Sequence, residues 1–231
     1  MFKTILLAAA ALTSATAAHA VTELVTNGSF SAATISAGQK ANFSGHVTGW
    51  GGGAALTYID APGTADDGSY LSVYKGFPAT SPDGGNFVEA DGDPSYRSAI
   101  TQTISGLTVG SQYTLTFYQG AGQQVGFTGP TTERWSVSFG TDTQLSSLFS
   151  LPQGATGPWQ AQTMTFTAHA TSQLLSFLAS GTPAGAPPIS FLDGVSLTAA
   201  VPEPATWALM VGGFVMVGVA VRRRRPAFVA A

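Results

Sequence analysis

Glu89, Asp91 and Asp93 occupy every second position in the segment NFVEADGDPSYR. In a β-strand, residues two apart project from the same face, so these carboxylates would gather negative charge on one surface. Such a row could bind a cation or accept hydrogen bonds from sugar hydroxyls. The pairs Asp91-Gly92 and Asp93-Pro94 are also typical of turns, which makes a solvated turn the alternative.

The acidic residues also define a catalytic alternative, the hydrolysis of a glycosidic bond. That reaction uses two carboxyl groups about 5 to 9.5 Å apart, one of them with a raised pKa. Glu89 could pair with Asp91 or with Glu133. The chain has no G-x-S-x-G segment and no cysteine, so serine-elbow and cysteine nucleophiles are excluded. We therefore predict a non-catalytic protein, with a glycoside hydrolase using Glu89, Asp91 or Glu133 as the alternative.

Trp50 is the aromatic residue best placed to contact a sugar. It precedes three glycines in VTGWGGG, and a loop would let its ring stack on the C–H surface of a pyranose. With Glu89 and Asp91 it completes the candidate glycan contacts. Trp135 differs, because it alternates with apolar residues in WSVSF, a spacing typical of a core strand. For any one aromatic residue here, packing is the competing interpretation.

Alternating apolar and polar residues predict that β-strands position these side chains. The runs YTLTFY (113–118), WSVSF (135–139) and QTMTFTA (162–168) each separate an apolar face from a Thr- or Ser-rich face. Gly, Pro, Asn and Asp cluster between such runs, and residues 21–200 contain no helical apolar stripe. We predict an all-β fold, an antiparallel β-sandwich of the jelly-roll type.

Charge restricts the partners of this domain. Residues 21–200 hold four basic and eleven acidic side chains, a net charge of −7, whereas the whole chain carries −3. The difference comes from the two ends of the chain. An acidic surface without a basic cluster repels phosphate groups, so nucleic-acid binding is excluded.

The sequence patterns at the two ends of the chain predict an export signal and a membrane segment. Residues 1–20 place Lys3 before an apolar run and close on AHA, a pattern that predicts a cleavable signal peptide and a signal peptidase. Residues 205–221 carry no charge and would form a helix of roughly 25 Å, slightly shorter than the ~30 Å hydrocarbon core. We predict that this helix spans the membrane. The positive-inside rule keeps a basic end in the cytoplasm, made of Arg222, Arg223, Arg224 and Arg225.

A proline step precedes the apolar run. Pro202 and Pro204 fix their own φ angles and favour extended geometry at the residues before them. Glu203 is thereby held as a single negative charge on an extended segment, a shape that a processing enzyme could bind.

The order VPEP, apolar span, RRRR resembles the PEP-CTERM sorting signal of Gram-negative bacteria. The resemblance covers about 25 residues within the tail 201–231. It implies that an exosortase recognises the Pro-Glu-Pro step. It also implies an inner-membrane intermediate and a final location in the cell envelope or the extracellular polysaccharide matrix.

The segments LVTNGSF, QTISGLTVGSQYTLTFYQGAG and SFLDGVSL resemble galactose-binding-like jelly rolls, including carbohydrate-binding modules. In such domains a structural calcium ion often joins the first and last strands. Here the resemblance implies a site at Asn27 and Asp193, although Ser31 stands where relatives usually have an acid. The alternative for Asp193 is a turn residue before Gly194. No other cofactor is expected.

These observations predict a signal peptide at 1–20, a β-sandwich at 21–200 and a sorting tail at 201–231. The expected function is that of an exported, non-catalytic surface or matrix protein that binds polysaccharide weakly. The alternatives are a secreted carbohydrate-active enzyme and a purely structural matrix protein.

Overall fold

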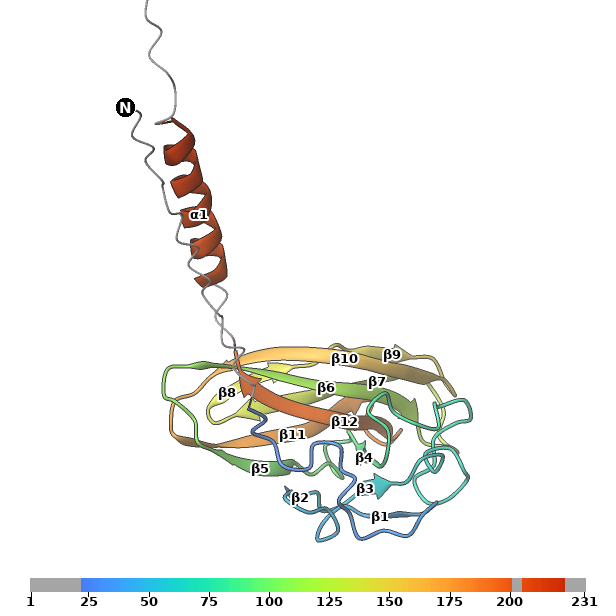
Figure 1. The fold of residues 1–231 in the computed structure, drawn as a ribbon. Helices are drawn as coiled ribbons and strands as arrows, with labels where there is room; N and C mark the ends of the chain where they lie inside the picture. Colours follow the sequence, from blue (N-terminus) through green and yellow to red (C-terminus); the bar gives the residue numbers. More distant parts are fainter. Residues whose placement is uncertain (1–21, 201–204, 223–231) are drawn as a thin grey trace, which may run out of the picture.

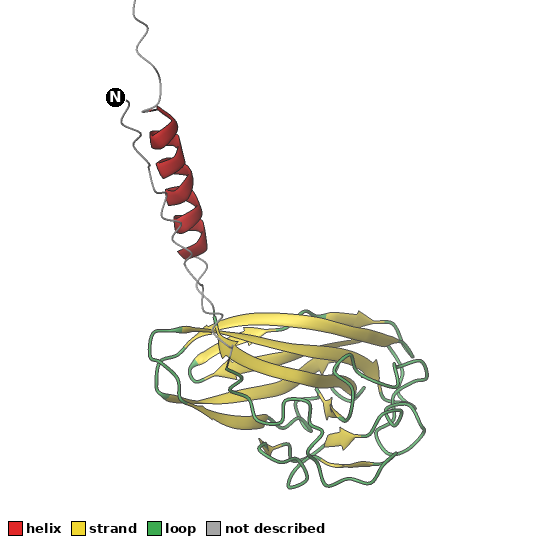
Figure 2. Ribbon diagram, in the orientation of Figure 1, coloured by secondary structure: helices red, strands yellow, loops and turns green. Residues whose placement is uncertain are grey.

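The computed structural model describes residues 22–200 and the helix 205–222 (Figure 1). The predicted signal peptide, the Pro-Glu-Pro step and the arginines 223–225 lie outside the described residues. The described part of the domain consists of β-strands and loops (Figure 2). The strands are β1 (Lys40–Asn42), β2 (Gly51–Gly52), β3 (Thr57–Asp60), β4 (Phe87–Asp91), β5 (Ile100–Ser105), β6 (Gln112–Gln123), β7 (Thr131–Phe139), β8 (Asp142–Leu145), β9 (Phe149–Leu151), β10 (Thr156–Thr167), β11 (Ser172–Thr182) and β12 (Pro188–Ala199).

The strands form two sheets that face each other. The first sheet has the order β1-β3-β4-β12-β6-β10, and the second has the order β2-β5-β11-β7-β8, with β9 also pairing with β7. Every pairing between these strands is antiparallel. The prediction of an all-β antiparallel sandwich is therefore confirmed.

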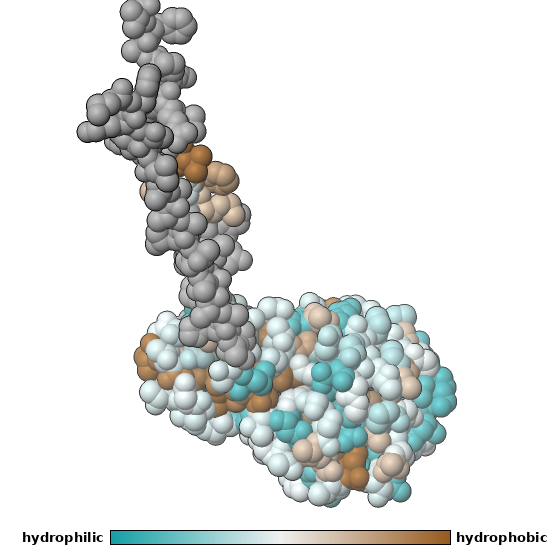
Figure 3. All heavy atoms as spheres, in the orientation of Figure 1, coloured by the Kyte–Doolittle hydropathy of each residue, from teal (hydrophilic) through white to brown (hydrophobic). Residues whose placement is uncertain are grey.

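Alternation along the strands builds the main core between the sheets. In β7, buried and partly buried residues alternate over the whole strand, which places Trp135, Val137 and Phe139 inside. The indole Nε1 of Trp135 donates to the carbonyl of Phe191 in the opposite sheet, at 3.0 Å. The core position predicted for Trp135 is therefore confirmed. On the face of the domain seen in Figure 3, hydrophilic and intermediate residues predominate, and the most apolar residues gather mainly in a strip on the left of the view.

A second, smaller core lies on the outer face of the first sheet. The connection between β3 and β4 runs from 61 to 86 and folds back over this face. Its residues Leu71, Val73 and Phe77 pack on Phe87 and Phe191. The rings of Phe77 and Phe191 stack with their centres 4.0 Å apart. The long connection is therefore a packed part of the domain rather than a free loop.

Close contact between Gly28 and the last strand yields a stability prediction. The carbonyl of Gly28 accepts a hydrogen bond from the amide of Val195 at 2.9 Å. A Cβ atom on Gly28 would lie only 1.8 Å from the carbonyl oxygen of Val195. We expect Gly28→Ala to lower the free energy of unfolding by about 2 kcal/mol or more, because backbone must move. Urea denaturation of the full chain measures this loss.

Gly51→Ala is the matched control, because the nearest atom to its added Cβ would be Thr101 Oγ1 at 3.6 Å, an ordinary contact. If both variants unfolded at the same urea concentration, the Gly28 contact would not constrain the fold.

The described C-terminal helix is α1, Ala205–Arg222. Among the residues that the structure describes, none of the helices combines the length and apolar character needed to cross a membrane. The membrane-spanning helix predicted for residues 205–221 stays a prediction.

Candidate functional site

A buried cluster of charge joins the first three strands of the first sheet. Lys40 on β1 lies opposite Asp60 on β3, and β4 brings in Glu89. The ammonium Nζ of Lys40 lies 2.5 Å from Glu89 Oε2 and 3.3 Å from Asp60 Oδ2. The Lys40 side chain is 5% exposed, and both carboxylates are fully buried. Two acids thus share one cation away from solvent. We call these three residues the charge cluster.

Burial sets the protonation of the charge cluster. It raises the pKa of Asp60 to about 6, although Lys40 opposes this shift. Burial and the neighbouring Asp60 raise the pKa of Glu89 well above its usual value. Burial lowers the pKa of Lys40, but the two acids raise it more, so the ammonium stays charged. The cluster therefore places one ammonium between two buried acids, both of which bind a proton more readily than an exposed carboxylate does.

Asp91 and Asp93 accept hydrogen bonds that stabilise a turn. Both are buried, whereas the turn interpretation expected them to be solvated. Asp91 Oδ1 accepts from the amide of Asp93 at 2.7 Å, and Asp93 accepts from Ser95 at 2.8 Å and Gly185 at 2.5 Å. Both acids are at most 1% exposed. Burial raises the pKa of Asp91 to about 6. The turn interpretation is right in its geometry, but solvation is wrong because neighbouring loops cover the carboxylates.

Glu133 is enclosed at one end of the sandwich. It shares the inward face of β7 with Trp135, it is fully buried, and neither of its carboxylate oxygens has a hydrogen-bond partner among the described residues. Burial raises its pKa to about 8. Glu89 lies on the outward side of β4, because its neighbours Val88 and Ala90 face the main core. The structure therefore does not bring Glu89 and Glu133 to one surface.

Trp50 packs in the main core instead of forming an exposed platform. Only 8% of its surface is exposed, and its ring centre lies 5.2 Å from that of Phe30. Its indole Nε1 donates to the carbonyl of Asn27 at 3.0 Å. Gly51 and Gly52, which follow Trp50, form the short strand β2, and this strand pairs with β5. The ring is therefore not available for stacking on a sugar.

The residues expected to hold calcium already bond to protein groups. The side-chain oxygen of Asn27 accepts from the amide of Ala32 at 2.9 Å, and its nitrogen donates to the carbonyl of Thr48 at 2.8 Å. Asp193 is fully buried, and its Oδ2 accepts a hydrogen bond from the hydroxyl of Ser81, whereas its Oδ1 has no partner among the described residues. Burial raises the pKa of Asp193 to about 8. In the described part of the chain, no three acidic or histidine side chains cluster as metal ligands would.

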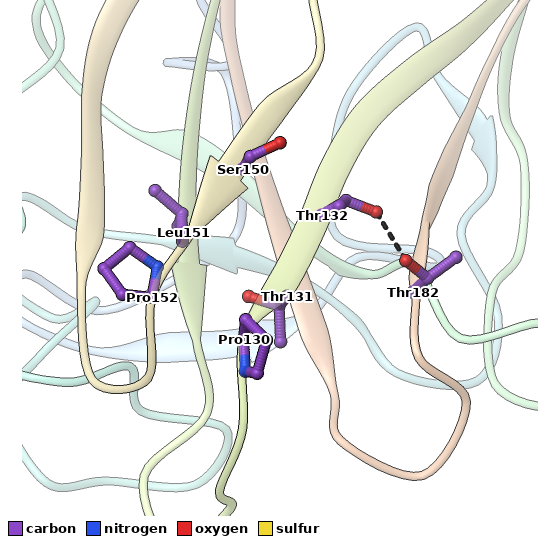
Figure 4. Close-up of a pocket in the computed structure, with 7 residues that line it drawn as sticks. All are labelled: Pro130, Thr131, Thr132, Ser150, Leu151, Pro152 and Thr182. Carbon is purple, nitrogen blue, oxygen red and sulfur yellow. Dashed lines mark hydrogen bonds between the residues drawn. The ribbon is translucent and has the colours of Figure 1, made fainter.

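One cavity opens between β7, β9 and the end of β11, with a volume of about 370 Å³ (Figure 4). The hydroxyls of Thr132 and Thr182 hydrogen-bond at 2.6 Å beside it. Its walls hold no charged or aromatic side chain and therefore offer little to orient a ligand. The lining residues are Pro130, Thr131, Thr132, Ser150, Leu151, Pro152 and Thr182.

A second cavity, of about 290 Å³, adjoins the charge cluster. Tyr58 on β3 and Tyr70 in the long connection meet edge to face there, with ring centres 5.6 Å apart. Burial and the proximity of Tyr70 raise the pKa of Tyr58 to about 12, so its phenol stays protonated. We call this cavity the tyrosine pocket. It is lined by Gly38, Gln39, Lys40, Tyr58, Asp67, Ser69 and Tyr70.

The sequence analysis did not identify the tyrosine pocket. Its lining comes from three separate segments: residues 38–40 at the start of β1, strand β3 and the connection 61–86. Only the pairing of β1 with β3 and the return of the connection bring them together. One signal was present, since Tyr58 alternates with Asp60 in TYID, which predicts that both side chains share a face.

Comparison with known proteins gives distant structural similarity. The module TmCBM61, solved with β-1,4-galactotriose, has 13% identity and a TM-score of 0.44, and the match covers 78% of this chain and 99% of that one. A CBM4 structure has 18% identity and a TM-score of 0.36, covering 76% and 99%. The K1 cleaved adhesin domain of Lys-gingipain from Porphyromonas gingivalis W83 has 12% identity and a TM-score of 0.41, covering 71% and 98%.

Among curated proteins, none matches the chain. A family model does match its end, over residues 200–225, and that model describes the PEP-CTERM protein-sorting motif. The segment includes Pro202, Glu203 and Pro204 and runs to Arg225. The sandwich is thus followed directly by a PEP-CTERM sorting motif.

Proposed function

We propose that this chain is an exported, non-catalytic surface protein that an exosortase releases from its C-terminal tail. The observation that carries the proposal is the sorting motif at 200–225, which begins one residue after the last strand ends at Ala199. In this scheme residues 1–20 are a signal peptide, 21–200 form the exported domain and 201–231 are the sorting tail.

The tail has three parts in this proposal. The step at Pro202, Glu203 and Pro204 is the exosortase recognition site. Residues 205–221 hold the chain in the inner membrane until processing, and the arginines at 222–225 stay in the cytoplasm. The released domain then belongs to the cell envelope or the extracellular matrix of a Gram-negative bacterium.

The charged residues favour a non-catalytic role. Glu89, Asp91 and Glu133 are fully buried, and none of them lines either of the two cavities described above. A glycosidase needs two carboxyl groups on opposite sides of one accessible bond. The tyrosine pocket favours weak carbohydrate binding as the role of the exported domain, because it joins an exposed aromatic ring to polar side chains in a concave site.

Intact-mass analysis of protein collected from the cell surface tests the sorting proposal. We expect a chain that begins at Val21 and ends between residues 201 and 204. Replacing both Pro202 and Pro204 by alanine should leave the tail attached, because the extended geometry around Glu203 is lost.

Pro226→Ala is the control, since Pro226 lies just outside the matched segment. Surface protein that still ends beyond Arg225, or full-length chain in the cytosol with both termini intact, would contradict the proposal.

A further inference from the structure

We propose that the tyrosine pocket binds a neutral saccharide, with Tyr70 as the stacking surface. This inference rests on the carbohydrate-binding role proposed above and gives it a site. The cavity, at about 290 Å³, is close in volume to the smallest ligand pockets, which measure about 300 Å³. It therefore suits one or two sugar units rather than a long chain.

Tyr70 offers the aromatic surface that such a ligand needs. It is 62% exposed, although large aromatic residues elsewhere in the domain are mostly buried. Tyr58 and Tyr70 are inclined at 61° and meet edge to face. Because they do not stack face to face, the pair leaves aromatic surface uncovered. Packing does not account for so exposed a ring beside a cavity.

The floor of the pocket is rigid. Tyr58 lies on β3, where it pairs with Asn42 on one side and with Glu89 on the other. The neighbouring Lys40 forms ion pairs with Asp60 and Glu89, the buried acids of the charge cluster, and these pairs connect β1 to β3 and β4. A site built on a paired strand loses little entropy when a ligand binds.

The loop that carries Tyr70 is also ordered by hydrogen bonds. Asp67 Oδ1 accepts from the amide of Ser69 at 2.7 Å, and Ser72 Oγ accepts from the amide of Gly68 at 3.0 Å. The amide of Ser72 donates to the carbonyl of Ser69 at 3.2 Å. These contacts fix the turn on both sides of Tyr70, so the ring is presented before the ligand arrives.

The charges around the pocket favour an uncharged ligand. The ammonium of Lys40 is directed at Glu89 and Asp60, and its side chain is 5% exposed, so it does not attract an anion. Asp67 lies exposed at the rim. Burial slightly opposes its ionisation, but hydrogen bonds from Ser69 hold its pKa below the usual value. An acidic sugar would meet this carboxylate, whereas neutral hydroxyls can donate to it.

Calorimetric titration of the full chain tests this site. The chain is held in a detergent without a sugar headgroup, and the probes are tetrasaccharides of glucose, mannose, galactose and xylose, with tetragalacturonate as the acidic probe. We expect at least one neutral probe to bind. Tyr70→Ala should weaken that binding by about tenfold or more, equivalent to about 1.4 kcal/mol. Tyr70→Phe should retain it, because the stacking face remains.

Tyr96→Ala is the matched control, since Tyr96 is also half exposed but lies outside the pocket. Binding unchanged in Tyr70→Ala, tighter binding of tetragalacturonate than of any neutral probe, or no binding of a neutral probe would each overturn the assignment. Failure of the sorting proposal is recognised separately, from the location and mass of the surface protein, which this titration does not measure.

Discussion

Replacing Lys40 by methionine is expected to lower the free energy of unfolding by about 3–5 kcal/mol at pH 8. The ammonium of Lys40 balances two fully buried carboxylates, at 2.5 Å from Glu89 and 3.3 Å from Asp60. Methionine preserves the length of the side chain but leaves both acids without a cation in a low-dielectric site. Urea denaturation of the full chain and the variant measures the loss.

The loss should be smaller at pH 5. Burial raises the pKa of Asp60 to about 6 and that of Glu89 well above its usual value, so at pH 5 both acids can hold a proton. Without charge on the carboxylates, the missing ammonium matters less. The variant therefore separates an electrostatic loss from a packing loss, since a packing loss would not change between the two pH values.

Lys75→Met is the control for this prediction. Lys75 pairs with Asp66 at 3.6 Å, but its side chain is 77% exposed. An exposed ion pair contributes less than about 1 kcal/mol, so this variant should unfold close to the parent midpoint. If Lys40→Met and Lys75→Met lost the same free energy, the charge cluster would not be a source of stability.

The sequence was informative where local patterns decide the structure. Period-two alternation predicted the strands that carry Tyr113, Trp135 and Phe166, because each strand must bury one face. The same logic placed Trp135 in the core. The order of Pro-Glu-Pro, apolar run and arginines predicted the sorting motif, which local order alone defines.

The sequence misled where long-range packing decides the environment of a side chain. Trp50 was a candidate sugar contact because glycines follow it, with core packing as the alternative, and only the fold decides for packing, because Phe30 and Phe177 enclose its ring. Asp93 was expected in a solvated turn, but the amide of Gly185, 92 residues away, covers it. No local pattern records such a contact. The tyrosine pocket depends in the same way on the return of the connection 61–86 to β1 and β3.

The buried acids predict an unusual dependence of stability on pH. Burial raises the pKa of Glu133 to about 8 and that of Asp193 to about 8. Between the usual carboxyl pKa near 4 and these folded values, the folded protein binds more protons than the unfolded chain. The free energy of unfolding therefore falls as the pH rises through this window. We expect the domain to be more stable at pH 5 than at pH 8.

The variant Glu133→Gln isolates the contribution of Glu133 to this pH dependence of stability. Glutamine has nearly the same shape as glutamate and carries no charge. The free energy of unfolding should therefore fall by roughly 3 kcal/mol less between pH 5 and pH 8 in the variant than in the parent. The variant should consequently be more stable than the parent at pH 8, when both are unfolded by urea. A parallel pH dependence in parent and Glu133→Gln chains would mean that Glu133 is ionised at little cost, and hence reached by solvent.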